Sequence, residues 1–517
     1  MKIKSLALLI CAVLPSFSAL AENIPVIQIA WKGNTYPAIM VKMKAASGLT
    51  RQQLPALLAL GDSSLSVNAA FKHATARGTE ISELQALDAK YGFDRYLRIA
   101  IPDERKRDIA YINGIVEELK QNANVEVVYP EAELIPHEDA VKTGRAAKQL
   151  KVIDYRSLQY YTKGPHGSSP SYSLGGVNRD SVNQFEGHEG ANVTILSHEL
   201  GMWNQNHINL PKAAFILGTP NNNQAMTDHD TASVGIMAAT DIGAGVKGLA
   251  WNTRMAYAAA GSDQLYNAIP RLQAGDVVQI GFEIAGGQQV GCADVCALPL
   301  ESQQAYFDVL KALTDKGVHV IEAAANGNID LDNSAFGGLF DLKKRDSGAI
   351  LAGAINPVDS MRASFSNYGS RVTSASWGLY VTSTGYGDLA RPNANETYTW
   401  QFNGTSSANP IIAGAVASLS SIAKAHGKTV TPRQMRDIIH DTGTPLAGNT
   451  STLIGTQPDM GRAVEKILEL DGEVISDEAP VISVDRATIN TVATSTNWSY
   501  PVTASSDQAN VSWEWKF

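Results

Sequence analysis

A serine with small neighbours stands at the start of an apolar, alanine-rich segment. Residues 403–410 read Asn-Gly-Thr-Ser-Ser-Ala-Asn-Pro, and almost only small and apolar residues follow to Leu419. This pattern predicts a buried helix that begins near Ser406, with Pro410 tolerated in its first turn. Unpaired N–H groups and the dipole at a helix N-terminus favour developing negative charge, which suits Ser406 as a nucleophile. A helix-capping serine is the structural alternative for this motif.

Two further polar residues have the types that serine chemistry needs. A nucleophilic serine requires a base for its proton, an acid that orients the base, and a donor for the oxyanion. His229, in the run Asp-His-Asp-Thr-Ala-Ser-Val-Gly, is the candidate base. Asn326, in the run Glu-Ala-Ala-Ala-Asn-Gly, is the candidate donor. A structural histidine and a turn asparagine are the alternatives for these two positions.

These residues fall within a stretch that reads as a parallel α/β sheet. Between about residues 186 and 420, short apolar runs alternate with helical segments. In such sheets ligands gather beyond the carboxyl ends of the strands. We expect Ser197, His198, Glu199 and Asn326 to follow strands, and His229 to open a helix over 230–239. The predicted strands are 192–196, 253–259, 276–282, 318–324, 349–354 and 381–384.

The motifs, taken in the order acid, His, Asn and Ser, resemble those of the subtilisin-like serine peptidases (subtilases) over about residues 175–465. The family's Gly-Thr-Ser-x-x-x-Pro motif is matched in full, and its His-Gly-Thr and Ala-Ala-Gly-Asn motifs with one change each. The resemblance implies a doubly wound, mainly parallel α/β sheet. It also implies a serine endopeptidase that cleaves polypeptides through an acyl-enzyme, with Ser406 as nucleophile, His229 as general base and Asn326 as oxyanion donor.

The resemblance also implies a place for the substrate. The region of Gly281, Phe282 and Glu283 would carry the edge strand that pairs with the backbone of an extended peptide, a case of β-augmentation. His198 and His207 lie outside the motifs, and we expect both at the surface.

The acid is where the family pattern breaks. The family has Asp at the end of the first strand, and Ser197 stands at that position here. A serine can hold an imidazole tautomer but cannot offset the imidazolium charge. Glu199 lies two residues on, hence on the same side of an extended chain, and is our candidate acid. Asp230 replaces the family's Gly next to His229, and we expect its side chain to point away from Nδ1.

The missing aspartate leaves a second function open. Loss of the acid from a serine peptidase costs about four orders of magnitude in turnover. A catalytically impaired, subtilase-like protein that binds peptides without cleaving them is therefore the alternative to a working peptidase.

The first 150 residues read as export and maturation segments. Lys2 and Lys4 precede an apolar run, and a small-residue site ends at Ala21, which predicts a signal peptide over 1–21. Residues 22–150 are predicted to be a small α+β unit and its linker, with strands at 36–44, 96–101 and 124–129, the last ended by Pro130, and a helix within 104–121. The resemblance implies a prodomain that inhibits its own peptidase until self-cleavage. The polar segment 131–151 reads as an exposed linker.

Two further segments complete the predicted organisation. The peptidase domain is predicted over 151–470, and 471–517 is a β-rich extension, incomplete as given, in which apolar and polar residues alternate from Val511 to Phe517. Cys292 and Cys296 remain after signal removal, and a disulfide is the expected state in an exported protein.

The composition limits the other functional classes. The chain has 517 residues, 44% hydrophobic and 18% charged, which is typical of a globular protein of several units. A net charge of −9 argues against a nucleic-acid partner, and the body has no apolar run long enough to span a membrane. We therefore expect a secreted or periplasmic monomer that needs no cofactor. Structural calcium is common in the family, but no loop in this sequence has a recognisable calcium-binding pattern.

Overall fold

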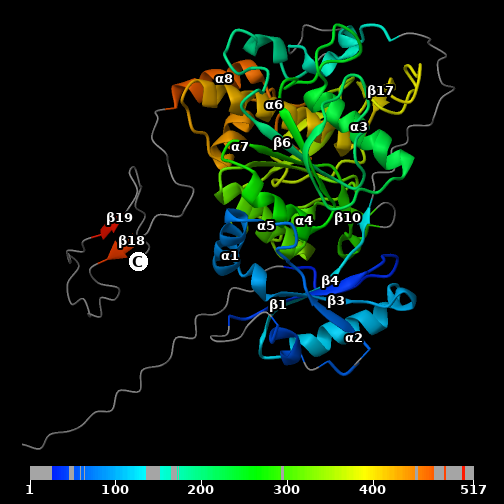
Figure 1. Cartoon of the computed structure of the whole chain (residues 1–517), viewed down its shortest axis with the longest axis vertical. Helices are drawn as coiled ribbons and strands as arrows, with labels where there is room; N and C mark the ends of the chain where they lie inside the picture. Colours follow the sequence, from blue (N-terminus) through cyan, green and yellow to red (C-terminus); the bar gives the residue numbers. More distant parts are fainter. Residues whose placement is uncertain are drawn as a thin grey trace, which may run out of the picture.

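The chain folds into a small N-terminal unit and a larger α/β domain (Figure 1). The structure is a computed structural model that describes residues 26–45, 52–58, 60–62, 64–135, 152–164, 172, 174–292, 296–448, 452–470, 482–484 and 504–506. Within these ranges, none of the helices combines the length and apolarity needed to cross a bilayer. The predicted signal peptide, most of the predicted linker and the alternating segment 511–517 lie outside the described residues.

The N-terminal unit is an antiparallel sheet of four strands in the order β2-β3-β1-β4. The prediction that Pro130 ends a strand is wrong, because β4 continues through it and pairs it with Ile39. β4 is an edge strand, where a proline deletes no ladder hydrogen bond that the sheet needs. The elements are β1 (Ala38–Met43), β2 (Ser66–Ala69), α1 (Thr79–Tyr91), β3 (Tyr96–Ala100), α2 (Ile109–Lys120) and β4 (Val125–Glu131).

The larger domain is built on one sheet in the order β14-β13-β12-β9-β6-β8-β7, with β15 also paired to β13. All its neighbours are parallel except β13 and β14. The strands are β6 (Thr194–Glu199), β7 (Ala213–Leu217), β8 (Arg254–Ala259), β9 (Val277–Ile280), β12 (His319–Ala323), β13 (Ile350–Asn356), β14 (Met361–Arg362) and β15 (Ser374–Trp377).

Five of the six predicted strands lie in this sheet, and one does not. The run 381–384 forms β16 (Val381–Thr384), which pairs antiparallel with β17 (Tyr398–Phe402) in a separate ribbon. Among the strands of this sheet, the prediction missed β7, β14 and β15. β7 lies at the edge of the sheet and alternates between half-buried and exposed residues, so it lacks the continuous apolar run of a central strand.

Helices cover both faces of the large sheet (Figure 1). The helices α4 (Ser262–Ala268) and α5 (Gln304–Asp315) lie on the side of the N-terminal unit, and their buried residues share one hydrophobic core with it. A second core lies on the opposite face. Its helices are α3 (Gln224–Ala238), α6 (Thr405–Ala425), α7 (Pro432–Asp441) and α8 (Met460–Glu469).

The N-terminal unit is joined to the larger domain by a buried ion pair and by a strand. Lys42 Nζ lies 2.7 Å from Asp308 Oδ2 of α5, and the Tyr96 hydroxyl donates to the same oxygen at 2.7 Å. β5 (Leu134–Ile135) then pairs antiparallel with β10 (Glu283–Ala285), whose other neighbour is β11 (Ala297–Leu298).

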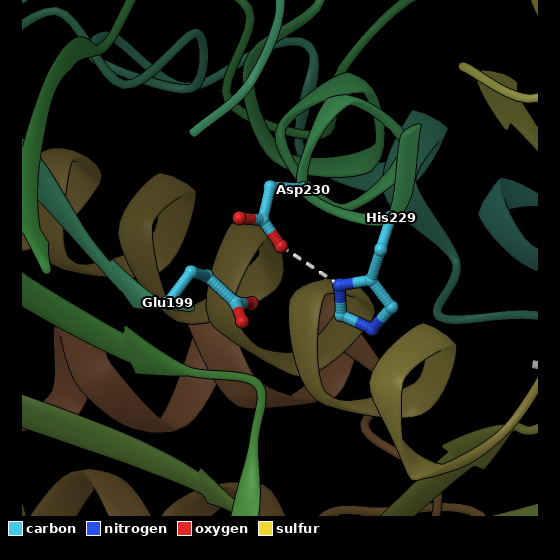
Figure 2. Close-up of side chains that lie close together, drawn as sticks. All are labelled: Glu199, His229 and Asp230. Carbon is cyan, nitrogen blue, oxygen red and sulfur yellow. Dashed lines mark hydrogen bonds and ion pairs between the residues drawn. The ribbon is translucent and has the colours of Figure 1, made fainter. Parts of the chain in front are cut away.

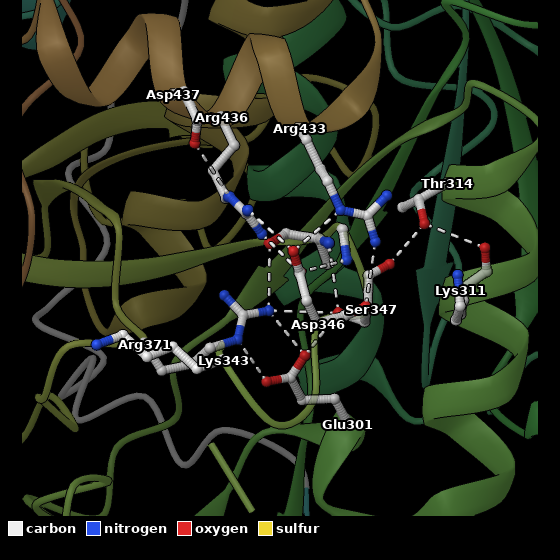
Figure 3. A network of polar contacts seen from close by, with 12 residues as sticks. Glu301, Lys311, Thr314, Lys343, Asp346, Ser347, Arg371, Arg433, Arg436 and Asp437 are labelled. Carbon is white, nitrogen blue, oxygen red and sulfur yellow. Dashed lines mark hydrogen bonds and ion pairs between the residues drawn. The ribbon is translucent and has the colours of Figure 1, made fainter. Parts of the chain in front are cut away.

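A network of buried and partly buried ion pairs joins α7 to the loop that carries Asp346 (Figure 3). Arg371 donates two hydrogen bonds of 2.7 Å to the Glu301 carboxylate, and both side chains are buried. Asp346 accepts from Arg433 at 3.0 Å and from Arg436 at 2.7 Å. Burial acts to raise the pKa of Asp346, but the hydrogen bond and charge of Arg436, the Gly348 N–H and the charge of Arg433 together outweigh it and hold that pKa well below the ordinary range.

Two smaller predictions concern the chain outside these layers. Cys292 and Cys296 form the expected disulfide, between β10 and β11. In the C-terminal stretch, β18 (Ile482–Val484) pairs antiparallel with β19 (Ala504–Ser506), and the rest of the predicted extension lies outside the described residues.

Candidate active site

Ser406 lies in the first turn of α6, as predicted. The helix begins at Thr405, and Gly404 precedes it with φ +90°, a conformation that a side chain would strain. Ser406 is fully buried, and its Oγ has no hydrogen-bond partner among the described residues. Pro410 lies inside the helix rather than in its first turn, so that prediction is wrong. The proline has no N–H to donate to the carbonyl of Ser406, one turn earlier.

Asn326 lies beside the start of α6, just beyond β12. Its Oδ1 accepts two hydrogen bonds of 3.0 Å from Thr405, one from the backbone N–H and one from the hydroxyl. A Cβ placed on Gly404 would lie 3.6 Å from Asn326 Nδ2 and 3.6 Å from Ser406 Oγ. An N–H donor and a hydroxyl therefore border the same small space. This arrangement suits a group that develops negative charge next to the serine.

His229 comes from α3, which packs against α6. The prediction that His229 opens this helix is wrong, because α3 begins at Gln224 and is capped by the Asn223 side chain. The imidazole is 6% exposed and packs edge to face on Phe402, with the ring centroids 5.4 Å apart. The ring is therefore fixed in place by packing as well as by hydrogen bonding.

The Nδ1 atom of His229 contacts the carboxylate of the next residue (Figure 2). Asp230 Oδ1 lies 2.8 Å from Nδ1, and Asp230 is 1% exposed. The expectation that Asp230 points away from Nδ1 is wrong. The reason is local space: a Cβ on Gly201 would lie 3.0 Å from Asp230 Oδ2, so the glycine leaves room for the carboxylate to turn toward the imidazole.

Glu199 belongs to the same cluster, as expected of the candidate acid, but the 2.8 Å contact with His229 Nδ1 is made by another residue. It ends β6, and its Oε1 accepts from Gln279 Nε2 at 2.9 Å. Ligand atoms of Glu199, His229 and Asp230 all lie within 4.8 Å of one another, a spacing at which such groups could also hold a metal ion. The hydrogen bond to Nδ1 that we assigned to Glu199 is made by Asp230 (Figure 2).

A network of neutral side chains adjoins Glu199 between β6, β9 and α6. Ser197 is fully buried, and its hydroxyl donates to Gln279 Oε1 at 3.1 Å. Gln279 Nε2 in turn donates to Glu199 and to Asn409 Oδ1, each at 2.9 Å. The sequence analysis missed Gln279. The signal was a lone polar residue in an otherwise apolar strand, in register with Ser197 across β6 and β9.

The carboxylates and their surroundings set the electrostatics of the cluster. Burial raises the pKa of Asp230, and the hydrogen bond with His229 opposes that shift. The Tyr257 hydroxyl donates to the backbone oxygen of Glu199 at 3.2 Å. Burial, followed by the charges of Asp230 and Glu199, raises the pKa of Tyr257. The tyrosine therefore stays neutral beside two carboxylates.

The predicted substrate strand begins later than expected. Of Gly281, Phe282 and Glu283, only Glu283 belongs to β10. A Cβ on Gly281 would lie 1.9 Å from Glu199 Oε1, so this residue passes close to the acidic cluster instead of pairing at the edge. Phe282 packs against His198, with centroids 5.1 Å apart.

Both histidines outside the motifs are buried, which corrects their expected place at the surface. His198 is fully buried and His207 is 3% exposed. Burial lowers the pKa of each to about 4, and both contact backbone carbonyls, so they remain neutral parts of the core.

An open cleft of about 720 Å³ adjoins Asn326. Its lining residues include Val290, Cys292, Phe365 and Tyr368. Glu283 connects this cleft to the edge strand, because its Oε2 accepts from the Asn326 backbone N–H at 2.7 Å. Candidate nucleophile, donor, edge strand and cleft are therefore contiguous.

Comparison with known proteins places this arrangement in a family. Residues 216–456 match the model of the subtilase family, Peptidase_S8. The chain is 27% identical over 283 residues to subtilisin DY from Bacillus licheniformis, which covers 53% of this chain and 92% of that protein. It is 30% identical over 156 residues to an extracellular basic protease from Dichelobacter nodosus. This alignment covers 30% of this chain and 24% of that relative, so the chain matches only about a quarter of its length.

The fold has a solved counterpart. Fervidolysin from Fervidobacterium pennivorans, described as a keratinolytic enzyme related to subtilisin, superposes with a TM-score of 0.52 at 14% identity. The alignment covers 89% of this chain and 65% of that one, and at this identity it supports the fold alone. The predicted α/β fold with a mainly parallel sheet is confirmed. Residues 216–456, which match the family model, therefore belong to a domain of the subtilisin-like serine peptidase family, the subtilases.

Proposed function

We propose that this protein is a secreted serine endopeptidase that hydrolyses peptide bonds through an acyl-enzyme on Ser406. The observation that carries the proposal is the space beside Gly404. Ser406 Oγ and Asn326 Nδ2 both border it, each 3.6 Å from the position of a Cβ on that glycine. A scissile carbonyl in this space would meet the nucleophile and an oxyanion donor together.

The chemistry follows from the residues present. His229 Nε2 removes the proton of Ser406 Oγ as the oxygen attacks the carbonyl carbon, and Asn326 Nδ2 donates to the resulting oxyanion. The imidazolium then gives its proton to the leaving amine as the C–N bond breaks. Water, deprotonated by the same imidazole, attacks the acyl-enzyme, and the proton returns to Ser406 Oγ when the carboxylic acid product leaves.

The N-terminal unit acts as the inhibitor of this site in a zymogen. β5 occupies the edge of β10, and the Ala285 N–H donates to the Glu133 carbonyl at 3.1 Å. An extended substrate needs the same edge for its backbone hydrogen bonds. The buried contact of Lys42 with Asp308 supports a stable complex between the two units. Self-cleavage after β5, between residues 136 and 151, would free the edge.

One observation supports a second candidate function. By our interpretation of the motifs Ser197 replaces the family's acid, and its hydroxyl donates to Gln279 Oε1. A protein that had lost its turnover could still use β10 to bind extended peptides. This alternative predicts an intact groove with no covalent chemistry at Ser406.

The test is to export the chain and its Ser406→Ala variant in parallel and to follow the N-terminal unit by gel electrophoresis and N-terminal sequencing. We expect the unmodified chain alone to be cut between about residues 130 and 160. Cutting of both chains alike by host enzymes, or of neither, together with no reaction of Ser406 with a fluorophosphonate, would favour the peptide-binding alternative.

A further inference from the structure

We infer that Asp230 on helix α3 is the positioning acid of this site, rather than Glu199 at the end of the strand β6. The inference rests on the proposed function, because it concerns the same serine chemistry. Its geometric basis is the 2.8 Å contact between Asp230 Oδ1 and His229 Nδ1 (Figure 2). The acid and the base are thus consecutive residues of one helix.

The contact selects the tautomer that the reaction needs. An ionised carboxylate only accepts, so Nδ1 carries the proton and donates it to Asp230. The lone pair then lies on Nε2, the nitrogen that must receive the proton of Ser406. Asp230 is 1% exposed, so its charge acts on the imidazolium with little screening by water.

Two polar side chains near the end of β6, Ser197 and Glu199, both form hydrogen bonds with Gln279. Ser197 has no charge, and its hydroxyl donates a hydrogen bond to Gln279 Oε1. Glu199 accepts from the amide of the same Gln279, which Asn409 also fixes. Ser197 and Glu199 are therefore both held to Gln279 of β9, and Asp230 is the carboxylate that contacts His229 Nδ1, at 2.8 Å.

Space for the relocated carboxylate comes from Gly201, in the loop after β6. A Cβ there would lie 2.7 Å from Met226 Cβ and 3.0 Å from Asp230 Oδ2. A side chain at residue 201 would press on the α3 backbone and on the carboxylate at once. The carboxylate at residue 230 thus coincides with a glycine at residue 201 that accommodates it.

The contact can be observed without turnover. In the Ser406→Ala background self-processing is blocked, so every variant is compared as the same uncut full-length chain. With ¹⁵N-labelled histidine, a proton on Nδ1 that is hydrogen-bonded to a carboxylate gives a resonance far downfield. The resonance is assigned to His229 by its absence from a His229→Gln chain. Asp230→Asn and Asp230→Gly each remove the carboxylate, and Glu199→Gln is the matched control within the cluster.

We expect the resonance to persist in Glu199→Gln and to disappear in both Asp230 variants. Asp230→Gly introduces the residue that the family has at this position, so it provides a second readout if Asp230→Asn folds poorly. Survival of the resonance in either folded Asp230 variant would overturn the inference, whatever the behaviour of Glu199→Gln.

Fluorophosphonate labelling of chains that retain Ser406 separates this inference from the proposed function. We expect Asp230→Asn to be labelled about 10⁴-fold more slowly than the parent, and Glu199→Gln to be slowed far less. The double variant Ser197→Asp with Asp230→Gly restores the family pattern and should recover part of the rate. An unlabelled parent would refute the proposed function, whereas the resonance would still decide which carboxylate holds His229.

Discussion

Removal of the Lys42 ammonium should release the N-terminal unit from the larger domain. Lys42 Nζ lies 2.7 Å from Asp308 Oδ2, and the two side chains are 8% and 11% exposed, so the ion pair is shielded from solvent. At an effective dielectric constant of about 20, the attraction is about 6 kcal/mol before desolvation is subtracted. Breaking a buried, hydrogen-bonded charge pair at an interface costs about 2–5 kcal/mol in affinity.

The structure places Lys42→Met at the low end of that range. Asp308 would keep a hydrogen bond of 2.7 Å from Tyr96 and another of 2.7 Å from Gln304, so its charge would not be left without a donor. We therefore expect a loss of about 2 kcal/mol, which is a weakening of the complex by about 30-fold. The substitution leaves the larger domain itself unchanged.

The assay is the rate at which a fluorophosphonate labels Ser406 in the processed but unseparated complex, because the probe reacts only after the N-terminal unit leaves. Lys44→Met is the matched control. It removes a lysine next to the same strand whose exposed ammonium donates to the Ala123 carbonyl, within the N-terminal unit, at 2.8 Å. Equal rates for Lys42→Met, Lys44→Met and the parent, with all chains equally stable to heat, would refute the reasoning.

Three further outcomes follow from the site and its surroundings. Asn326→Ala should lower kcat by about 10²–10³ with little change in KM for a peptide substrate, since one oxyanion donor is lost; an unchanged kcat would remove Asn326 from the chemistry. Gly281→Ala should slow labelling of Ser406 and lower the melting temperature, because its Cβ would meet Glu199 Oε1 at 1.9 Å, and normal values for both would contradict this packing. Burial, then the Glu301 carboxylate, raise the pKa of Glu322 to about 8 from 4.5. Because the pKa is higher in the folded state, the contribution of Glu322 to the free energy of unfolding is present below pH 4.5 and is lost as the pH rises to 8. Glu322→Gln should therefore flatten the fall in the free energy of unfolding with pH, measured with denaturant. An identical pH profile for parent and variant would contradict this.

The parts of the site that short motifs determine were predictable from the sequence. Ser406 and Asn326 stand at the junction of a strand or loop with the next element, where a local pattern of glycine and small residues fixes the backbone. Central strands such as β6 and β9 were recognisable because helices cover both faces of the sheet, which requires continuous apolar runs. The apolar pattern of a strand does not indicate which strand it pairs with. Residues 381–384 were therefore assigned to the large sheet, although they pair with β17.

The partner of His229 was not predictable in the same way. Consecutive side chains on a helix diverge by about 100°, which made Asp230 an unlikely neighbour for Nδ1. The contact depends on the buried surroundings of α3 and on the room beside Gly201, and both are tertiary features. The role of Gln279 was hidden for the same reason, because only the register between β6 and β9 brings it to Ser197.

The central claim is that Ser406 is the nucleophile, and the most direct measurement is the mass of a fluorophosphonate adduct mapped to a single residue. Ser407 provides the control: it is the next residue in α6 and equally buried, but its hydroxyl donates to the Trp377 carbonyl at 3.0 Å. We predict one adduct, on Ser406, that is lost in Ser406→Ala and retained in Ser407→Ala. No adduct on the cut chain, or an adduct that survives Ser406→Ala, would contradict the account.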